Sequence, residues 1–247
     1  MADRTPLAES IAAAQAWWRE AGVDMIYHDE PQGWLAEPEP EPEASAAPAV
    51  AKKPAPAPRP RIGGDPASWP QDLASFRDWW LTEPSLDAGG TSPRLAPRGE
   101  AGAEVMLLVP MPEAGDADTL LSGREGKLLA SLATAIGLPP EAVYIATALP
   151  RHTPLPDWEQ VTADGMGEVL LHHIQLAAPK RLIVLGMRIL PLLGHDPAQL
   201  APAVSELAIQ PAAVPMLATY GPDKLLANAR ARAALWQRWL DWTSEGL

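Results

Sequence analysis

Four short apolar runs recur along the second part of this chain, and their spacing restricts the fold more than any other feature. They are Val105–Val109, Val143–Ala148, Leu182–Leu185 and Val214–Ala218. Apolar runs of this length without polar alternation are typical of strands that are buried on both faces of a parallel sheet. Their starts lie about 30 to 40 residues apart, which is the spacing of repeated β-α-β units.

The segments between these runs have the periodicity of amphipathic helices. A first helix opens at Ser68-Trp69-Pro70, and further helices are expected over residues 126–136, 160–176, 187–193 and 229–242. The pattern predicts an α/β fold with three α/β/α layers and a four-stranded parallel sheet. Ligands of such sheets bind beyond the carboxyl ends of the strands, which here means the segments 110–118, 147–156, 186–188 and 219–226.

The chain divides into three parts. Residues 1–35 contain a short amphipathic helix that begins near Thr5 and ends at Gly22, and they carry Trp17, Trp18 and Trp34. Residues 36–61 form a linker rich in proline, alanine and glutamate, and residues 62–247 form the α/β domain. Such a linker is extended and semi-rigid, with a reach of about 75 Å. The first part either packs back on the domain or docks a partner protein through its tryptophans, and we favour docking.

Charge and composition exclude several classes of protein. The formal net charge is −12, and residues 62–247 carry 13 basic and 21 acidic side chains, which argues against general binding of nucleic acid. The absence of cysteine excludes disulfides, thiolate metal sites and iron–sulfur clusters, and we expect no cofactor and no metal. We find no signal pattern and no apolar run long enough to span a membrane, so we expect a cytoplasmic protein.

Four motifs lie in order at strand ends and helix starts. In chain order they are Gly123-x-x-Gly126-x-Leu128-Leu129, Val143-Tyr144-Ile145-Ala146-Thr147, Ala178-Pro179-Lys180 through Val184-Leu185-Gly186, and Thr219-Tyr220-Gly221-Pro222 with Leu225, Leu226, Asn228 and Trp236. Together they resemble the uracil-DNA glycosylase superfamily, most closely its family-4-like, iron–sulfur-containing bacterial members. The segment Trp18–Asp24 resembles the start of many α-proteobacterial members, which also carry an alanine- and proline-rich linker.

The chain departs from this family at the positions that carry its catalytic and base-reading residues. By the resemblance, Pro110 stands in place of the acid that positions water, and Gly221 replaces a histidine. Thr147 stands in place of the asparagine that reads the uracil edge, and Leu121 in place of the phenylalanine that stacks on the flipped base. The cluster cysteines are absent, and the residues near three of their places are Ser85, Arg151 and Met166. Since losing one stabilising donor costs about 10²–10³ in rate, these losses predict a protein that is not an enzyme.

The resemblance also assigns positions of contact. Met111, Leu121, Thr147 and Thr219 correspond to the pocket that holds the base. Leu225 and Leu226 correspond to the wedge that enters the duplex, and on a protein without catalysis they serve equally well as packing or partner contacts. Arg230 and Arg232, with Arg238, either contact phosphates or form the polar face of the last helix, and we favour the polar face.

Several other polar residues can be interpreted either as functional groups or as ordinary structural or surface residues. Glu113, Asp116 and Asp118 follow the first strand, where they are either a substitute general base or a solvated acidic loop. His152 is interpreted as a surface imidazole. His172 and His173 point about 100° apart on a helix, so they cannot hold one metal together, and we expect surface or boundary positions for both.

Two main hypotheses of function remain, and a third, a binder of DNA lesions without cleavage, is disfavoured by the net charge of −8 over residues 62–247. The first is a non-catalytic interaction protein of DNA replication or repair, which binds a protein partner through residues 1–35 and has at most weak affinity for DNA. Its architecture has an analogue in the psi subunit of the bacterial replicative clamp loader, which also has a glycosylase-like fold and a short N-terminal docking peptide. The second is an active uracil-DNA glycosylase with a rearranged site and no iron–sulfur cluster.

Overall fold

The computed structural model describes residues 7–22, 61–196, 204–209 and 212–244. These residues fall into two compact units, one containing helix α1 (Leu7–Glu20) and the other containing every described residue from 61 onward. Apart from Arg61, the predicted linker over residues 36–61 lies outside the described residues, and so does Trp34.

Helix α1 forms where the apolar periodicity predicts it. It ends at Glu20, and Gly22 follows with a φ of 80°, the left-handed conformation that glycine adopts most readily. None of its residues is buried, and the indole rings of Trp17 and Trp18 contact each other edge to face with their centroids 5.0 Å apart. The helix therefore presents its apolar side chains at its surface.

The second unit is built on a mostly parallel sheet. In the described part of the chain the sheet has five strands, which are β1 (Val105–Val109), β2 (Val143–Thr147), β3 (Leu182–Leu185), β4 (Val204–Ile209) and β5 (Ala212–Thr219). Their order across the sheet is β2-β1-β3-β5-β4, and the first four are parallel. The four predicted apolar runs are all strands, and they form this parallel part.

Strand β4 corrects the prediction of a four-stranded sheet. It pairs antiparallel with β5 at the edge of the sheet, and Ser205 lies opposite Met216. Of its side chains only Leu207 is buried, since an edge strand is half exposed. Its sequence is interrupted by the polar Ser205 and Glu206 and therefore lacks the continuous apolar run that identified the other strands.

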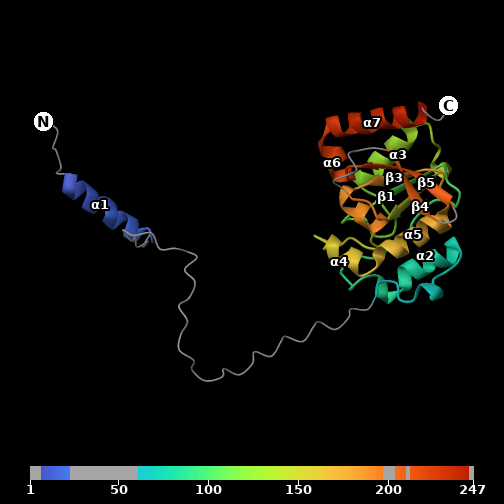
Figure 1. Ribbon diagram of the computed structural model, residues 1–247, viewed down its shortest axis with the longest axis horizontal. Coiled ribbons are helices and arrows are strands. Elements are labelled where there is room, and N and C mark those ends of the chain that lie inside the picture. The colour runs from blue at the N-terminus through green and yellow to red at the C-terminus, as the bar shows by residue number, and fades with distance from the viewer. Residues whose placement is uncertain (1–6, 23–60, 197–203, 210–211, 245–247) are drawn as a thin grey trace, which may run out of the picture. The chain divides into compact units, whose positions relative to one another are not determined.

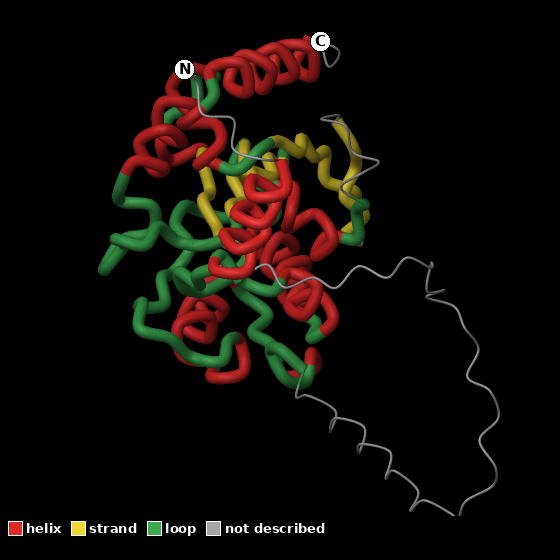
Figure 2. The backbone as a smooth tube through the Cα atoms, turned by 90° about the vertical axis from the view of Figure 1, so that its left-hand side faces the viewer, coloured by secondary structure: helices red, strands yellow, loops and turns green. Residues whose placement is uncertain are grey.

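Helices cover both faces of the sheet (Figures 1 and 2). They are α2 (Leu73–Thr82), α3 (Arg124–Ala135), α4 (Trp158–Ala163), α5 (Met166–Ala177), α6 (Pro222–Ala227) and α7 (Ala229–Ser244), with a 3₁₀ helix over Met187–Leu193. Successive residues of β1 point to opposite faces, so Met106 and Leu108 pack with α2 and α5 while Leu107 packs with α3 and α7. The fold is thus an α/β fold with a core on each side of the sheet.

The helix expected over residues 160–176 is divided into α4 and α5. Gly165 separates them with a φ of 98°, which a residue with a side chain rarely adopts. Asp157 caps α4, and its carboxylate accepts a hydrogen bond from the backbone N–H of Gln160. The apolar periodicity continues across the break, which explains why the pattern alone indicates a single helix.

The interpretation of His173 as a surface or boundary residue is wrong. Its imidazole is fully buried on α5, where Nε2 lies 2.8 Å from the hydroxyl oxygen of Tyr144 and the ring stacks on Phe76. Burial lowers the pKa of His173 to about 3, so the ring is neutral at physiological pH. His172 is only half-buried, and its Nε2 lies 2.7 Å from the carbonyl oxygen of Pro70.

Among the described helices, none combines the length and the apolar character needed to cross a membrane.

Candidate functional site at the carboxyl ends of the strands

The register of the sheet brings the predicted loop segments to one edge. Val109 of β1 lies beside Thr147 of β2, and Leu185 of β3 lies beside Thr219 of β5. Hydrogen bonds continue just beyond the strands, since the N–H of Gly186 donates to the carbonyl of Thr219 at 3.0 Å. The four loops that follow the parallel strands therefore meet, as the topology predicts.

The positions that would form a glycosylase pocket are tightly packed. The ring of Pro110 lies against Gly186, where a Cβ atom would come within 2.8 Å of the proline Cγ. Thr147 is buried, and its hydroxyl donates to the carbonyl of Leu149 at 2.7 Å. Leu121 is also buried, while Met111 is half-buried and packs on the core beneath the sheet edge.

Thr219 is the exception among these positions. Its side chain is buried at the end of β5, and its hydroxyl makes no hydrogen bond with any described residue. The neighbouring Gly221 precedes α6, in the place where the resemblance has a histidine. The hydroxyl of Thr219 is therefore a polar atom at this edge that the described residues leave unpartnered.

Asp116 is a structural group of the loop after β1. Its two carboxylate oxygens accept four hydrogen bonds of 2.8–2.9 Å, from the N–H groups of Glu113, Leu121 and Ser122 and from the Ser122 hydroxyl. Burial raises the pKa of Asp116, but these hydrogen bonds outweigh burial and lower the pKa below its ordinary value of 3.8. They also hold Leu121 in a left-handed conformation, with a φ of 53°.

Glu113 organises the start of helix α3. Its Oε1 accepts hydrogen bonds of 3.0 Å from the N–H groups of Gly123 and Gly126, which are otherwise unsatisfied donors near a helix N-terminus. A side chain on Gly123 would overlap this carboxylate, and one on Gly126 would overlap the carbonyl of Leu121. The two glycines of the first motif thus have a local packing reason.

The remaining candidates in these loops lie nearer the surface. Asp118 is exposed. His152 is half-buried, and its Nδ1 lies 3.0 Å from the carbonyl oxygen of Pro112, so the ring ties the loop after β2 to the loop after β1. Within the described residues no group of histidine, aspartate or glutamate side chains has the arrangement of a metal site.

Glu125 is a candidate that sequence reasoning missed. It lies in the first turn of α3 and lines a pocket of about 380 Å³, together with Glu113, Arg124, Asp223 and Leu226. Burial, together with the nearby carboxylates, above all Glu113, raises the pKa of Glu125 from 4.5 to about 7, while His152 acts in the opposite direction. Acidic residues are common in first helical turns, so no sequence pattern distinguishes this one.

The last motif has mainly structural roles. Leu225 is 1% exposed and packs in the core between α3 and α7, while Leu226 is half-buried beside the Glu125 pocket. Asn228 caps α7, because its side-chain oxygen accepts a hydrogen bond of 2.9 Å from the N–H of Arg230. Arg232 donates from Nη1 to the carbonyls of Leu225 and Leu226 at 2.6 and 3.1 Å, and Arg230 is exposed.

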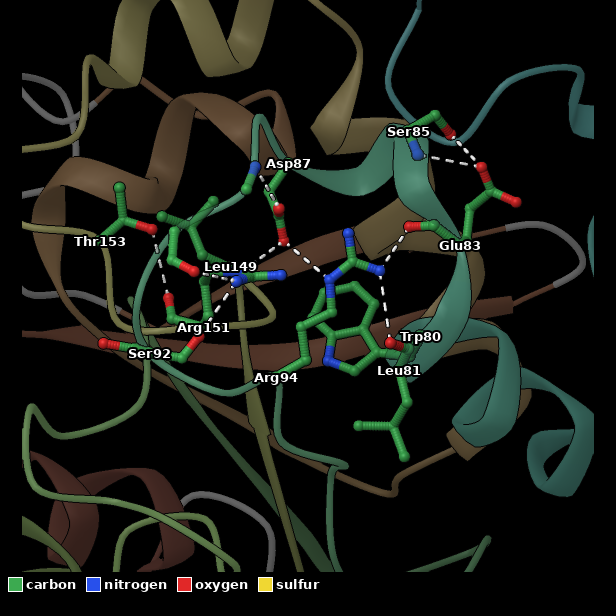
Figure 3. Close-up of polar contacts among 12 residues, drawn as sticks. Trp80, Leu81, Glu83, Ser85, Asp87, Ser92, Arg94, Leu149, Arg151 and Thr153 are labelled. Atoms are coloured by element: carbon green, nitrogen blue, oxygen red, sulfur yellow. Dashed lines mark hydrogen bonds and ion pairs between the residues drawn. The ribbon is translucent and has the colours of Figure 1, made fainter.

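Arg151, which the resemblance places near a cysteine of the family, belongs to an ion-pair network (Figure 3). The Oδ2 atom of Asp87 accepts hydrogen bonds of 2.9 Å from Nε of both Arg94 and Arg151. Burial raises the pKa of Asp87, but hydrogen bonds from Arg94, Gly89 and Arg151 outweigh it and lower the pKa. The network ties the segment after α2 to the loop after β2.

The other two residues near cysteine places do not join this network. Ser85 donates its hydroxyl to the carboxylate of Glu83 at 2.6 Å, and Met166 is buried at the start of α5. Comparison with known proteins adds no relative: no family model matches the chain, and no curated protein matches it.

Proposed function

We propose that this chain is a non-catalytic interaction module of DNA replication or repair, built on a uracil-DNA glycosylase-like domain. Two features support the family part of the proposal. The four motifs occur in the family's order, and they fall at strand ends and helix starts of a mostly parallel sheet with helices on both faces. The edge strand β4 is an addition to the four parallel strands that the sequence predicts.

The observation that carries the non-catalytic part is that the carboxylates after β1 already accept hydrogen bonds from the protein's own backbone. A glycosylase must read an extruded base and stabilise the charges that develop on the base and the sugar, which requires polar groups aimed at the substrate. Here Asp116 and Glu113 direct their oxygens at backbone N–H groups of their own loop and of α3. The Thr147 hydroxyl likewise donates its hydrogen bond to a backbone carbonyl.

Helix α1 supports the interaction part of the proposal. Trp17 is 61% exposed and Trp18 is 52% exposed, and Leu7 and Ile11 are exposed on the same helix. Tryptophan is among the residues that contribute most to protein interfaces, because it buries a large area with little loss of conformational freedom. A short amphipathic helix of this kind is suited to a groove on a partner protein.

The second candidate function is an active glycosylase with a rearranged site, and one observation favours it. Glu125 lines a pocket, and its carboxyl group has a pKa raised to about 7. A carboxyl group with such a pKa is well matched to general acid–base catalysis at neutral pH. The pocket is bordered by Leu226, which the resemblance places at the wedge.

An excision assay separates the two functions. The full chain is incubated with single- and double-stranded DNA containing one uracil, abasic sites are cleaved, and the products are resolved on a gel beside an active glycosylase. The proposal predicts no product above the background without protein. Robust excision by the wild type, lost in Glu125→Gln and retained in Asp118→Ala, would establish the rearranged enzyme and refute the non-catalytic module.

A further inference from the structure

An apolar groove lies between helices α3 and α7 on one side of the sheet. Helix α6 packs against both of them, and its Leu225 forms the floor of the groove together with Leu129 and Leu235. The groove has a volume of about 380 Å³, at the lower end of the roughly 300–1,000 Å³ that is usual for ligand pockets. Apart from Leu225, its lining residues lie on α3 and α7, outside the loop segments that follow the strands.

The walls of the groove are partly exposed and mostly apolar. Leu128 and Leu132 line it from α3, and Trp236, which is 38% exposed, lines it from α7. Leu240 lies one helical turn beyond Trp236 and is also exposed, so the apolar strip continues along α7 past the groove. Apolar side chains that gather on one exposed face, rather than singly, are a feature of protein interaction surfaces.

The charges around the groove are opposite in sign to those of the rest of the domain. Helices α3, α6 and α7 carry six basic and three acidic side chains, whereas residues 62–247 as a whole carry 13 basic and 21 acidic ones. Arg232 is the charged side chain among the residues that line the groove. Lys127 lies one turn before Ser131 on the same face of α3, whereas Arg124 lines the neighbouring pocket that contains Glu113.

The acidic side chains of these helices are directed elsewhere. Glu125 and Asp223 line the neighbouring pocket that also contains Glu113. Asp241, near the end of α7, accepts a hydrogen bond of 2.9 Å from the side chain of Gln237. The groove therefore combines an apolar interior with basic groups at its border.

We propose that this groove binds an acidic amphipathic helix of a partner protein. The apolar side chains of this partner helix contact Leu128, Leu132 and Trp236, and the carboxylates of the partner helix pair with Arg232 and Lys127. A helix in a groove is a common form of peptide recognition, read through apolar anchors at i, i+3 or i+4, and i+7. Complementary charges at the border orient the peptide and accelerate its association.

The lining favours such a peptide over a nucleic acid. Binding of a phosphate backbone rests on many basic contacts along a surface, whereas here leucine, alanine and tryptophan side chains make up most of the lining. The inference rests on the proposed function, since it names the surface and the chemistry for a partner of the α/β domain. Excision activity would refute the non-catalytic proposal without bearing on peptide binding. Absence of peptide binding would refute only the assignment of the groove as a binding site.

Fluorescence anisotropy of the full-length protein with designed peptides tests the inference. The first probe is a labelled helical peptide of about 16 residues with leucine and tryptophan anchors on one face and glutamates beside them. The second has every glutamate replaced by lysine. We expect the acidic peptide to bind at least about tenfold more tightly than the basic one, a difference of about 1.4 kcal/mol. Equal affinities, or no binding of the acidic peptide, would overturn the inference.

Two matched substitutions locate the binding. Ala233→Glu places a carboxylate in the groove, and Ala130→Glu places one at an exposed position of α3 outside it. The first is expected to weaken binding of the acidic peptide about tenfold, and the second to leave the affinity unchanged. An unchanged affinity in Ala233→Glu would overturn the inference. So would displacement of the peptide by a DNA duplex, or self-association of the protein that Ala233→Glu abolishes.

Discussion

At the scale of single residues, Asp116 shows how one carboxylate can fix a loop. It accepts four hydrogen bonds while it is almost completely buried, and three of the donors are backbone N–H groups. Hydrogen bonds to a charged group contribute more than neutral ones, and a buried donor that loses its partner is costly. The loop conformation, including the left-handed Leu121, therefore depends on this single side chain.

Asp116→Asn tests this role. The amide retains one acceptor oxygen and turns an N–H₂ group toward backbone donors, so we expect a loss of about 2–3 kcal/mol in the free energy of unfolding. Urea denaturation followed by circular dichroism measures the loss. The exposed Asp118 provides the control, since Asp118→Asn is expected to change stability by less than about 0.5 kcal/mol. Equal stabilities for the two variants would contradict the structural role.

Glu125 predicts a dependence of stability on pH. Its pKa is raised from 4.5 to about 7 by burial and by neighbouring carboxylates, so the folded state holds a proton that the unfolded state has released. Its contribution is most favourable below pH 4.5, and it is lost as the pH rises to about 7. Glu125→Gln should therefore stabilise the protein at pH 8 but not at pH 4. Urea titrations of both proteins at the two pH values measure this, and a pH-independent difference would refute it.

At the scale of elements, the sequence predicted the interior of the fold better than its edges. The four apolar runs became β1, β2, β3 and β5, because strands buried on both faces need uninterrupted apolar sequence. Strand β4 was missed because an edge strand with one buried side chain has no such run. The break at Gly165 was missed because both helices present apolar residues to the same core.

The candidate site was predictable in place but not in detail. Parallel topology fixes which loops meet, so the segments after β1, β2, β3 and β5 were identified correctly from their positions. The hydrogen bonds of Glu113 and Asp116 depend on the conformation of one loop, which no periodic pattern encodes. Burial of Glu125 and His173 depends on packing between distant segments, and this too leaves no local signal.

At the scale of the whole molecule, we propose a protein that acts by binding. The strand edge uses its acidic groups internally, whereas α1 exposes its tryptophans and the groove between α3 and α7 exposes Trp236 beside the partly buried Leu128 and Leu132. The two surfaces belong to different units of the chain, so each can be altered without touching the other. Their separate roles can therefore be measured one at a time.

Co-purification with variants of α1 tests the central claim most directly. Full-length tagged protein is recovered from the cells that produce it, and the proteins bound to it are identified and quantified by mass spectrometry. Trp17→Ala combined with Trp18→Ala removes the exposed indoles without disturbing a core, since no residue of α1 is buried, and Gln15→Ala on the same helix is the matched control. We predict that one specific partner is retained by the wild type and by Gln15→Ala and is lost from the tryptophan variant. Recovery of the same proteins in the same amounts with all three would contradict the claim.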